Sequence, residues 1–234
     1  MSIKKSILTL IGLIASLSGY AQYYIECEDT CNHIHGIDIS HYQGNVFWDA
    51  VEDVSNNKIY YVYLKATEGG DNIDSRYLEN ITMAKRAGLK VGSYHFYRPR
   101  VPQETQLKNF RTQCRPQDQD LIPMIDVEVT GGLSSSALCD SLQKFLKLIE
   151  AEYKQKPIIY TGQNFYNKHL VGQIDEYKLM VAKYSEPAPG LIDERDIFAW
   201  QYTGKGRLRG VNGYVDKSRL LGRHTMREIR FVHR

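Results

Sequence analysis

Four acidic residues stand where short apolar segments of the chain end. Asp38 lies in GIDIS, Asp126 and Glu128 lie in PMIDVE, and Asp216 closes GYVD. Aspartate is disfavoured within strands, and burying an ionised carboxylate is costly, so the position of these acids at strand ends needs a physical explanation. If the apolar segments are parallel strands of one barrel, their C-terminal ends share a rim. We therefore expect the four carboxylates to converge on that rim.

The spacing of Asp126 and Glu128 suggests a specific chemistry. Alternate residues of a strand point to the same side, so both carboxylates can face one substrate. Crowded negative charges raise the pKa of at least one member of the group. Cleavage of a glycosidic bond needs such a protonated acid to donate to the leaving oxygen, beside ionised carboxylates that stabilise positive charge on the sugar. The alternative is that each acid caps a following helix or pairs with a surface cation.

Polar and aromatic side chains end the other predicted strands. Lys65, Tyr94, Tyr160 and Gln201 occupy these positions, and the chain as a whole has 17 tyrosines. Exposed aromatic rings stack on sugars, and neighbouring donors bind hydroxyl and acetamido groups. We predict that these four residues line a substrate-binding groove.

Three further rings lie close to these positions in the sequence. Packing within the barrel is the simpler interpretation of Tyr61 and Phe96, since large rings are mostly buried in folded proteins. His95 fits two roles equally well, a hydrogen-bonded structural histidine or a contact to a ligand. Both roles of His95 stay open on the sequence alone.

Short apolar segments alternate with amphipathic segments along the chain, a pattern typical of β/α units with a parallel sheet. The predicted strands are 35–39, 60–66, 90–96, 121–127, 157–160, 179–182, 197–201 and 213–215. The predicted helices are 47–54, 75–87, 103–113, 135–153 and a weaker 163–170. Eight strands suit an irregular TIM-like (β/α) barrel of the α/β class, in a single domain with shorter segments beyond Leu170. A doubly wound open sheet is the alternative.

The residues singled out above belong to seven short motifs. In chain order these are GIDIS with a downstream QG and Trp48, KATEG, GSYHFY, DVE, IIYT, WQY and VD, and they span roughly residues 35–220. Each motif is weak alone, but seven in register are specific. Together they resemble family 25 of the glycoside hydrolases, the N-acetylmuramidase lysozymes. The resemblance implies an irregular barrel, with fewer helices than strands, that cleaves the β-1,4 bond between N-acetylmuramic acid and N-acetylglucosamine in peptidoglycan.

Carried over by position, the resemblance gives each carboxylate a role. Glu128 would be the general acid. Asp126 would be its partner, which stabilises the transition state or orients the substrate's acetamido oxygen for attack at the anomeric carbon. Asp38 and Asp216 would flank this pair, tune its proton affinity and hold substrate. The resemblance implies neither a metal nor an organic cofactor. The groove-lining positions of the family correspond to Lys65, Tyr94, Tyr160 and Gln201.

Three other functions are compatible with parts of the pattern. A non-catalytic glycan-binding barrel would keep the fold without the chemistry, although the chain retains every expected carboxylate. A barrel hydrolase could act on another polymer, such as chitin. A metal-dependent hydrolase could use His33, His35 or His41. A zinc site of Cys27, Cys31, His33 and His35 has suitable residue types but loose spacing.

The first residues of the chain predict export. Lys4 and Lys5 precede an apolar run over 6–17, and the small residue Ala21 fits a signal-peptidase site. The run is shorter than the roughly 20 residues of a membrane span. We therefore expect cleavage near Ala21, an exported protein in the periplasm or outside the cell, and no stable membrane insertion. An uncleaved anchor is the alternative.

Four segments follow from these patterns: a signal peptide at 1–21, an N-terminal extension at 22–34, the barrel at 35–222 and a basic tail at 223–234. The formal charge of +3 for the whole chain falls to +1 for residues 22–234, which hold 28 basic and 27 acidic residues. Such a balance is unlike the basic surface of a nucleic-acid binder. We expect a monomer whose partner is the peptidoglycan strand and not nucleic acid.

All four cysteines follow the predicted signal peptide, so export would carry them into an oxidising compartment. Three pairings are possible. Cys27 with Cys31 and Cys114 with Cys139 is favoured, because the first two are close in sequence and the second bridge would tie two consecutive helices.

Overall fold

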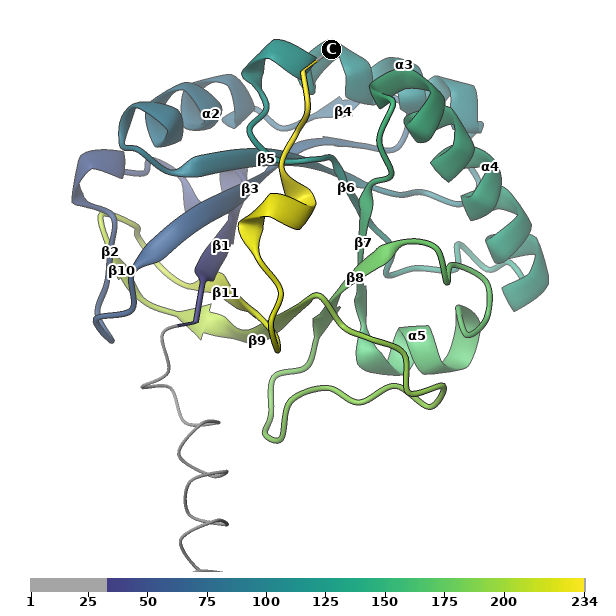
Figure 1. Cartoon of the computed structure of the whole chain (residues 1–234). Helices are drawn as coiled ribbons and strands as arrows, with labels where there is room; N and C mark the ends of the chain where they lie inside the picture. Colours follow the sequence, from purple (N-terminus) through teal and green to yellow (C-terminus); the bar gives the residue numbers. More distant parts are fainter. Residues whose placement is uncertain (1–32, 234) are drawn as a thin grey trace, which may run out of the picture. The chain divides into compact units, whose positions relative to one another are not determined.

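Eight strands form a closed barrel within residues 33–233, the part of the chain that the computed structural model describes (Figure 1). The strands are β1 (His35–Ile39), β3 (Ile59–Glu68), β5 (Lys90–Phe96), β6 (Met124–Asp126), β7 (Ile158–Gly162), β8 (Lys178–Ala182), β9 (Ala199–Gly206) and β11 (Val215–Leu220). Their order is β1-β11-β9-β8-β7-β6-β5-β3, and β3 pairs with β1 to close the ring. The predicted α/β barrel is confirmed, and this closure excludes the open sheet.

Four α-helices of the described residues lie outside the barrel: α2 (Tyr77–Arg86), α3 (Gln103–Gln113), α4 (Ser135–Tyr153) and α5 (Gln163–His169). The best predicted of them, α4, begins where the Ser134 side chain accepts a hydrogen bond from the Ala137 amide. It buries an apolar face at the expected spacing, so the sequence pattern and the packing agree. No helix among residues 33–233 is long and apolar enough to cross a bilayer.

The helix predicted over 47–54 is wrong. A single 3-10 turn, η2 (Trp48–Ala50), is followed by the short strand β2 (Glu52–Asp53), which pairs with β10 (Leu208–Arg209). The buried Trp48 ring donates from Nε1 to Asn80 Oδ1 at 3.2 Å, and the Phe47 amide donates to Gly210 O. These bonds to distant segments override the local helical pattern.

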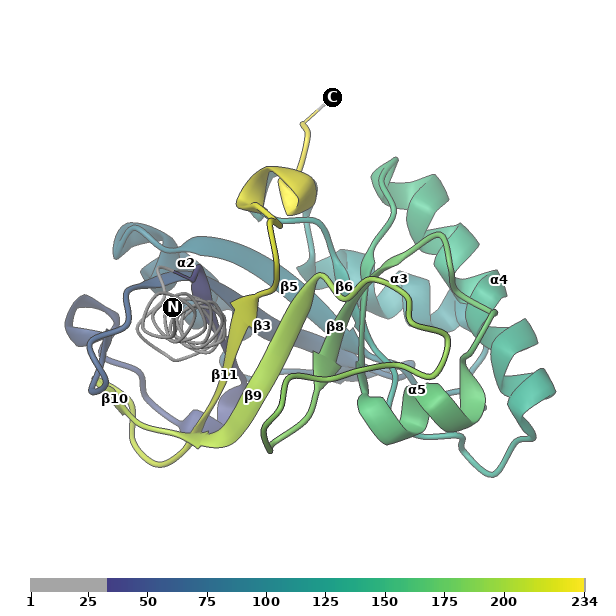
Figure 2. The same ribbon diagram turned by 60° about the horizontal axis from the view of Figure 1, so that its bottom comes forward.

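One strand of the barrel runs opposite to the others. β11 pairs antiparallel with both β1 and β9, whereas β8 and β9 are parallel (Figure 2). The prediction that a strand over 213–215 ends at Asp216 is therefore wrong, because β11 begins at Val215. The start of an antiparallel strand meets the ends of its neighbours, so Asp216 still reaches the expected rim.

The barrel interior is filled by tyrosine rings that two glycines make room for. A Cβ at Gly36 would lie 2.1 Å from the Tyr61 ring, and one at Gly92 would lie 2.4 Å from the Tyr63 ring. Both rings are fully buried, which confirms the packing role expected for Tyr61. The hydroxyls of both rings also form hydrogen bonds, that of Tyr61 with Ser218 Oγ at 2.9 Å. Neither buried hydroxyl therefore lacks a hydrogen-bond partner.

The C-terminal segment covers the end of the barrel where the parallel strands start. Its 3-10 turn η4 (Met226–Ile229) places the Ile229 side chain among the interior residues with no exposure to solvent. The Ile122 amide donates to Ile229 O at 2.8 Å, and Leu121 forms a bridge with Arg230. The residues just before β6 thus bond to the C-terminal segment, and β6 begins at Met124 and not at the predicted residue 121.

The predicted bridge between Cys114 and Cys139 is absent from the described part of the chain, where both are buried free thiols. Cys114 O accepts from the Tyr153 hydroxyl at the C-terminal end of α4, whereas Cys139 lies near the start of that helix. At 1.5 Å per residue, the helix separates Cys139 from Tyr153 by about 21 Å. A disulfide needs Cα atoms within about 7 Å. The signal peptide, Cys27 and Cys31 lie outside the described residues.

Candidate active site

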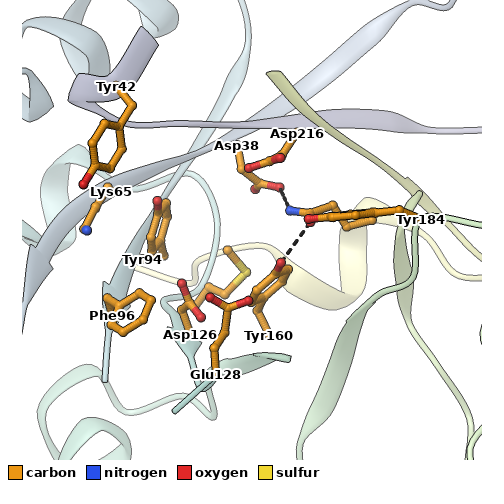
Figure 3. Close-up of a pocket in the computed structure, with 12 residues that line it drawn as sticks. Asp38, Tyr42, Lys65, Tyr94, Phe96, Asp126, Glu128, Tyr160, Tyr184 and Asp216 are labelled. Atoms are coloured by element: carbon orange, nitrogen blue, oxygen red, sulfur yellow. Dashed lines mark hydrogen bonds between the residues drawn. The ribbon is translucent and has the colours of Figure 1, made fainter. Parts of the chain in front are cut away.

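A cleft of about 230 Å³ opens at the rim where the parallel strands end (Figure 3). It contains all four carboxylates and all four groove residues singled out from the sequence. The lining residues are Asp38, Tyr42, Lys65, Tyr94, Phe96, Met124, Asp126, Glu128, Tyr160, Tyr184, Gln201 and Asp216. Side chains from segments almost 180 residues apart in the sequence thus meet around one open space.

Asp38 and Asp216 face each other across one side of the cleft. They are direct partners in the antiparallel ladder of β1 and β11, an arrangement that normally brings Cβ atoms to about 4.5–5.5 Å. Burial raises the pKa of Asp38, the negative charge of Asp216 adds to the rise, and a hydrogen bond from Gln201 partly opposes both effects, so that the resulting pKa is about 8. At neutral pH Asp38 is therefore mostly protonated, and burial raises the pKa of Asp216 as well.

Asp126 and Glu128 form the opposite side of the cleft. β6 ends at Asp126, and the chain stays extended because the Val127 amide donates to Tyr160 O and Val127 O accepts from the Thr161 hydroxyl. Asp126 is buried, whereas Glu128 is exposed at the mouth. Burial and the neighbouring Glu128 charge raise the pKa of Asp126.

The pKa of Glu128 is also raised. Although this side chain reaches solvent, the surrounding protein removes part of its water shell, and the charge of Asp216 adds to the shift, while the Tyr160 hydroxyl opposes it. Because the pKa values of Asp126 and Glu128 are both raised, these two residues hold a proton to higher pH than two isolated carboxylates would. The site can thus present a proton at the mouth of the cleft.

Two carboxylate oxygens in the cleft have no partner. Asp38 Oδ1 and Asp126 Oδ1 are buried and form no hydrogen bond with any described residue. None of the four carboxylates makes an ion pair within residues 33–233, and none caps an α-helix there. Surface pairing and capping are therefore wrong as explanations for these acids. An unpaired buried acceptor is costly, so these oxygens are suited to bind donors of a ligand.

A chain of hydrogen bonds fixes the orientation of Asp38. Tyr160 and Tyr184 both donate to Gln201 Oε1, at 2.9 and 2.7 Å, and Gln201 Nε2 donates to Asp38 Oδ2 at 2.8 Å (Figure 3). Two donors on one amide oxygen leave the amide nitrogen no alternative but to face Asp38. The same bond turns the unpaired Oδ1 of Asp38 away from Gln201.

The comparison with known families agrees with this geometry. Residues 37–211 match the model of glycosyl hydrolases family 25. The chain belongs to this family. It is 34% identical over 188 residues to the protein YegX of Escherichia coli (strain K12), covering 78% of this chain and 68% of that protein. It is 32% identical over 181 residues to the autolytic lysozyme of Clostridium acetobutylicum, covering 77% of this chain and 54% of the lysozyme.

The fold comparison reaches the same family. The crystal structure of the bacterial lysozyme from Streptomyces coelicolor superposes with a TM-score of 0.73 at 29% identity, covering 83% of this chain and 94% of that one. Family membership and lysozyme relatives support a glycoside hydrolase, with peptidoglycan as the substrate of such enzymes.

Phe96 has a different place from the one predicted for it. Its ring is half-buried and lines the cleft of this family 25 enzyme, so barrel packing was the wrong interpretation. Because Phe96 is two residues after Tyr94 on β5, both rings point to the cleft side. Lys65 Nζ lies 5.4 Å from the Phe96 centroid and donates to Glu68 Oε2 at 2.7 Å. Arg98 contacts the same ring, 4.5 Å from its centroid.

The role of His95 is structural. It lies between Tyr94 and Phe96 and faces the helices, where it is fully buried against ring side chains of α3 and α4. Its ring nitrogens pair with Thr67 Oγ1 at 2.7 Å and Gln106 Oε1 at 3.0 Å. Burial lowers the pKa of His95 to about 4, so the ring is neutral under ordinary conditions.

His41, named above as a possible metal ligand, is bound instead to an acid. Its Nδ1 lies 2.7 Å from Asp74 Oδ2, which also accepts from the His41 amide. Among residues 33–233, no three His, Cys, Asp or Glu side chains are grouped as a metal site would need.

Tyr42 and Tyr184 are cleft residues that the sequence analysis missed. Tyr42 is in η1 (His41–Gln43), just after β1, and Tyr184 follows β8 by two residues. The rule applied to the other strands, that residues just beyond a strand end face the rim, would have found both.

Proposed function

We propose that this protein is a lysozyme, which hydrolyses the β-1,4 bond between N-acetylmuramic acid and N-acetylglucosamine in peptidoglycan. The observation that carries the proposal is the cleft itself. It unites a solvent-reachable Glu128 of raised pKa with the buried Asp126 beside it. Glycosidic cleavage requires a positioned proton donor next to groups that stabilise positive charge at the anomeric carbon.

Glu128 acts as the general acid in this proposal. Its position at the mouth lets it reach the glycosidic oxygen, and its raised pKa keeps the proton available to higher pH than in an isolated glutamate. The proton moves to the leaving oxygen as the bond to the anomeric carbon breaks. Glu128 then serves as the base that takes a proton from the attacking water.

Asp126 supports the reacting sugar. Its unpaired Oδ1 accepts a hydrogen bond from the acetamido N–H of the substrate, which turns the acetamido oxygen toward the anomeric carbon. The displacement is completed there by that oxygen or by water. Asp38 and Asp216 hold hydroxyl groups on the other side, and the charge of Asp216 adds to the effect of burial that keeps the pKa of Glu128 high.

The conservative variant Glu128→Gln tests the acid role. It keeps the size and hydrogen-bonding capacity of the side chain but cannot donate the proton, so kcat on purified peptidoglycan should fall at least about 100-fold. Glu104→Gln, an exposed glutamate in the first turn of α3, is the matched control and should keep full activity. Near-normal turnover by the Glu128 variant would show that Glu128 is not the general acid.

Product analysis separates the lysozyme from its rivals. Muramic acid is expected at the new reducing ends of digested peptidoglycan. If new reducing ends appear only when chitin is the substrate, the enzyme acts on a different polymer. Absence of new reducing ends with any glycan, together with retained binding, would indicate the non-catalytic barrel. Full activity in a metal chelator is expected, since no step above uses a metal.

We further propose that the enzyme is exported and monomeric. The charged start, the apolar run over 6–17 and the small residue Ala21 support export. Terminal sequencing of the protein recovered from the periplasm or the medium should start at Gln22. Light scattering after gel filtration should give the mass of one chain, and the mass of a dimer would contradict the monomer.

A further inference from the structure

Two exposed tyrosines lie in or near the cleft. Tyr42 is 79% exposed and lines the cleft, whereas Tyr214 is 52% exposed and lies outside it, two residues before Asp216. Solvent-facing rings beside a glycan cleft are typical of sugar-stacking positions, because the ring face matches the C–H face of a pyranose. The mechanism above gives no role to Tyr214.

A single glutamine ties the two tyrosine-bearing segments together. Gln43 Oε1 accepts from the Ser40 amide at 2.9 Å, and Gln43 Nε2 donates to Tyr214 O at 3.2 Å. The turn that carries Tyr42 is thereby joined to the loop that carries Tyr214.

Arg207 holds the Tyr214 ring in place. Its guanidinium carbon lies 4.3 Å from the ring centroid, and Nη1 donates to Gly213 O at 3.1 Å. Arg207 is exposed and makes no ion pair within residues 33–233, so its charge and most of its five donors stay available. A fixed ring beside free guanidinium donors can bind a sugar by stacking and by hydrogen bonds at once.

We propose that Tyr214 and Arg207 form an additional sugar-binding subsite, which takes an N-acetylated hexosamine of the glycan strand beyond the residues held in the cleft. Tyr214 stacks on the pyranose face, and Arg207 donates to the acetamido carbonyl oxygen or a ring hydroxyl. The occupant is argued from position: Gln43 joins the Tyr214 loop to the turn whose Tyr42 lines the cleft, so a glycan strand longer than the cleft can reach the Tyr214 ring. The inference rests on the proposed lysozyme function.

Chain-length dependence tests the subsite. Tyr214→Ala should raise KM about tenfold on long glycan strands, the loss expected for one stacking contact, while kcat stays within about twofold. On the shortest oligosaccharide that the enzyme cleaves, which does not reach Tyr214, both constants should be unchanged. Tyr214→Phe keeps the ring and should restore most of the affinity. Equal effects at every length, or none at any length, would overturn the proposal.

Tyr60 provides a matched control. It is 40% exposed, Lys58 Nζ lies 5.0 Å from its ring centroid, and it stands near the start of β3, at the opposite end of the barrel. Tyr60→Ala therefore removes a similar exposed ring with a similar cation contact, and it should leave KM unchanged for long and short substrates alike. A matching rise in KM for this variant would show that the Tyr214 effect is not local.

A binding measurement separates failure of the subsite from failure of the lysozyme function. Glu128→Gln alone should co-sediment with insoluble peptidoglycan, and adding Tyr214→Ala should weaken that binding about tenfold. If the unmodified enzyme cleaves no glycan but the two variants still differ in sedimentation, the lysozyme proposal fails and the subsite stands. If both variants sediment equally, the subsite is wrong whatever the activity.

Discussion

Asp38 and Asp216 are direct neighbours across the antiparallel ladder of β1 and β11, although 178 positions of the chain separate them. This contact exists because β11 is the strand that runs against the others. It places two carboxylates at one level of the rim, where the Asp216 charge adds to the effect of burial on Asp38, whose pKa is raised to about 8. The same Asp216 charge also raises the pKa of Glu128.

Removing the Asp216 charge should move the pH profile of the enzyme. The charge of Asp216 raises the pKa of Glu128, so Asp216→Asn lowers it. The acid must be protonated to work, and activity falls as pH rises through its pKa. The alkaline limb of kcat/KM should therefore shift to lower pH. Asp175→Asn, which removes an exposed charge remote from the cleft, should leave the limb in place. An unmoved limb in the Asp216 variant would contradict the coupling.

The orientation of Asp38 should depend on the donor that Gln201 supplies. Gln201→Glu keeps an acceptor for the Tyr160 and Tyr184 hydroxyls but loses the N–H that holds Asp38 Oδ2. We expect kcat to fall about tenfold, the equivalent of one hydrogen bond between neutral groups. Tyr184→Phe removes one of two donors to the amide oxygen and should cost less than tenfold. An equal loss in both variants would argue against the directional chain of bonds.

The C-terminal segment should contribute to stability through Ile229. This side chain is fully buried in the barrel interior, so Ile229→Ala should lower the free energy of unfolding by about 2–4 kcal/mol. Val232→Ala, three residues on and 54% exposed, should change it by less than about 0.5 kcal/mol. Urea denaturation followed by circular dichroism measures both values. Similar stabilities for the two variants would mean that the Ile229 side chain does not pack in the barrel interior in solution.

Cys114 and Cys139 should be free thiols in the purified enzyme. Burial raises the pKa of the Cys114 thiol to about 12, so the folded protein should react slowly with iodoacetamide at this residue. After unfolding without reductant, peptide mass spectrometry should find both cysteines fully alkylated. Labelling that appears only after addition of a reductant would reveal a disulfide and contradict the separation described above.

Local patterns predicted much of this protein correctly. The spacing of apolar residues located α3 and α4 with their observed bounds, and Gly88 ends the preceding helix with a φ of +87°, as expected of a glycine stop. The same reasoning failed for 47–54, where the segment is short and its partners are distant. Helical periodicity is informative over a long segment because each residue adds to one face, whereas a short segment is decided by its tertiary bonds.

The types of residue at the strand ends were determined by the sequence alone: four carboxylates, a lysine, two tyrosines and a glutamine, whose convergence follows once a barrel is assumed. Only the tertiary structure decided the direction of β11, the pairing of Asp38 with Asp216, the separation of Cys114 from Cys139 and the burial of Ile229. Strand direction and pairing depend on contacts between residues far apart in the chain. Such contacts leave no periodic trace in either of the segments that form them.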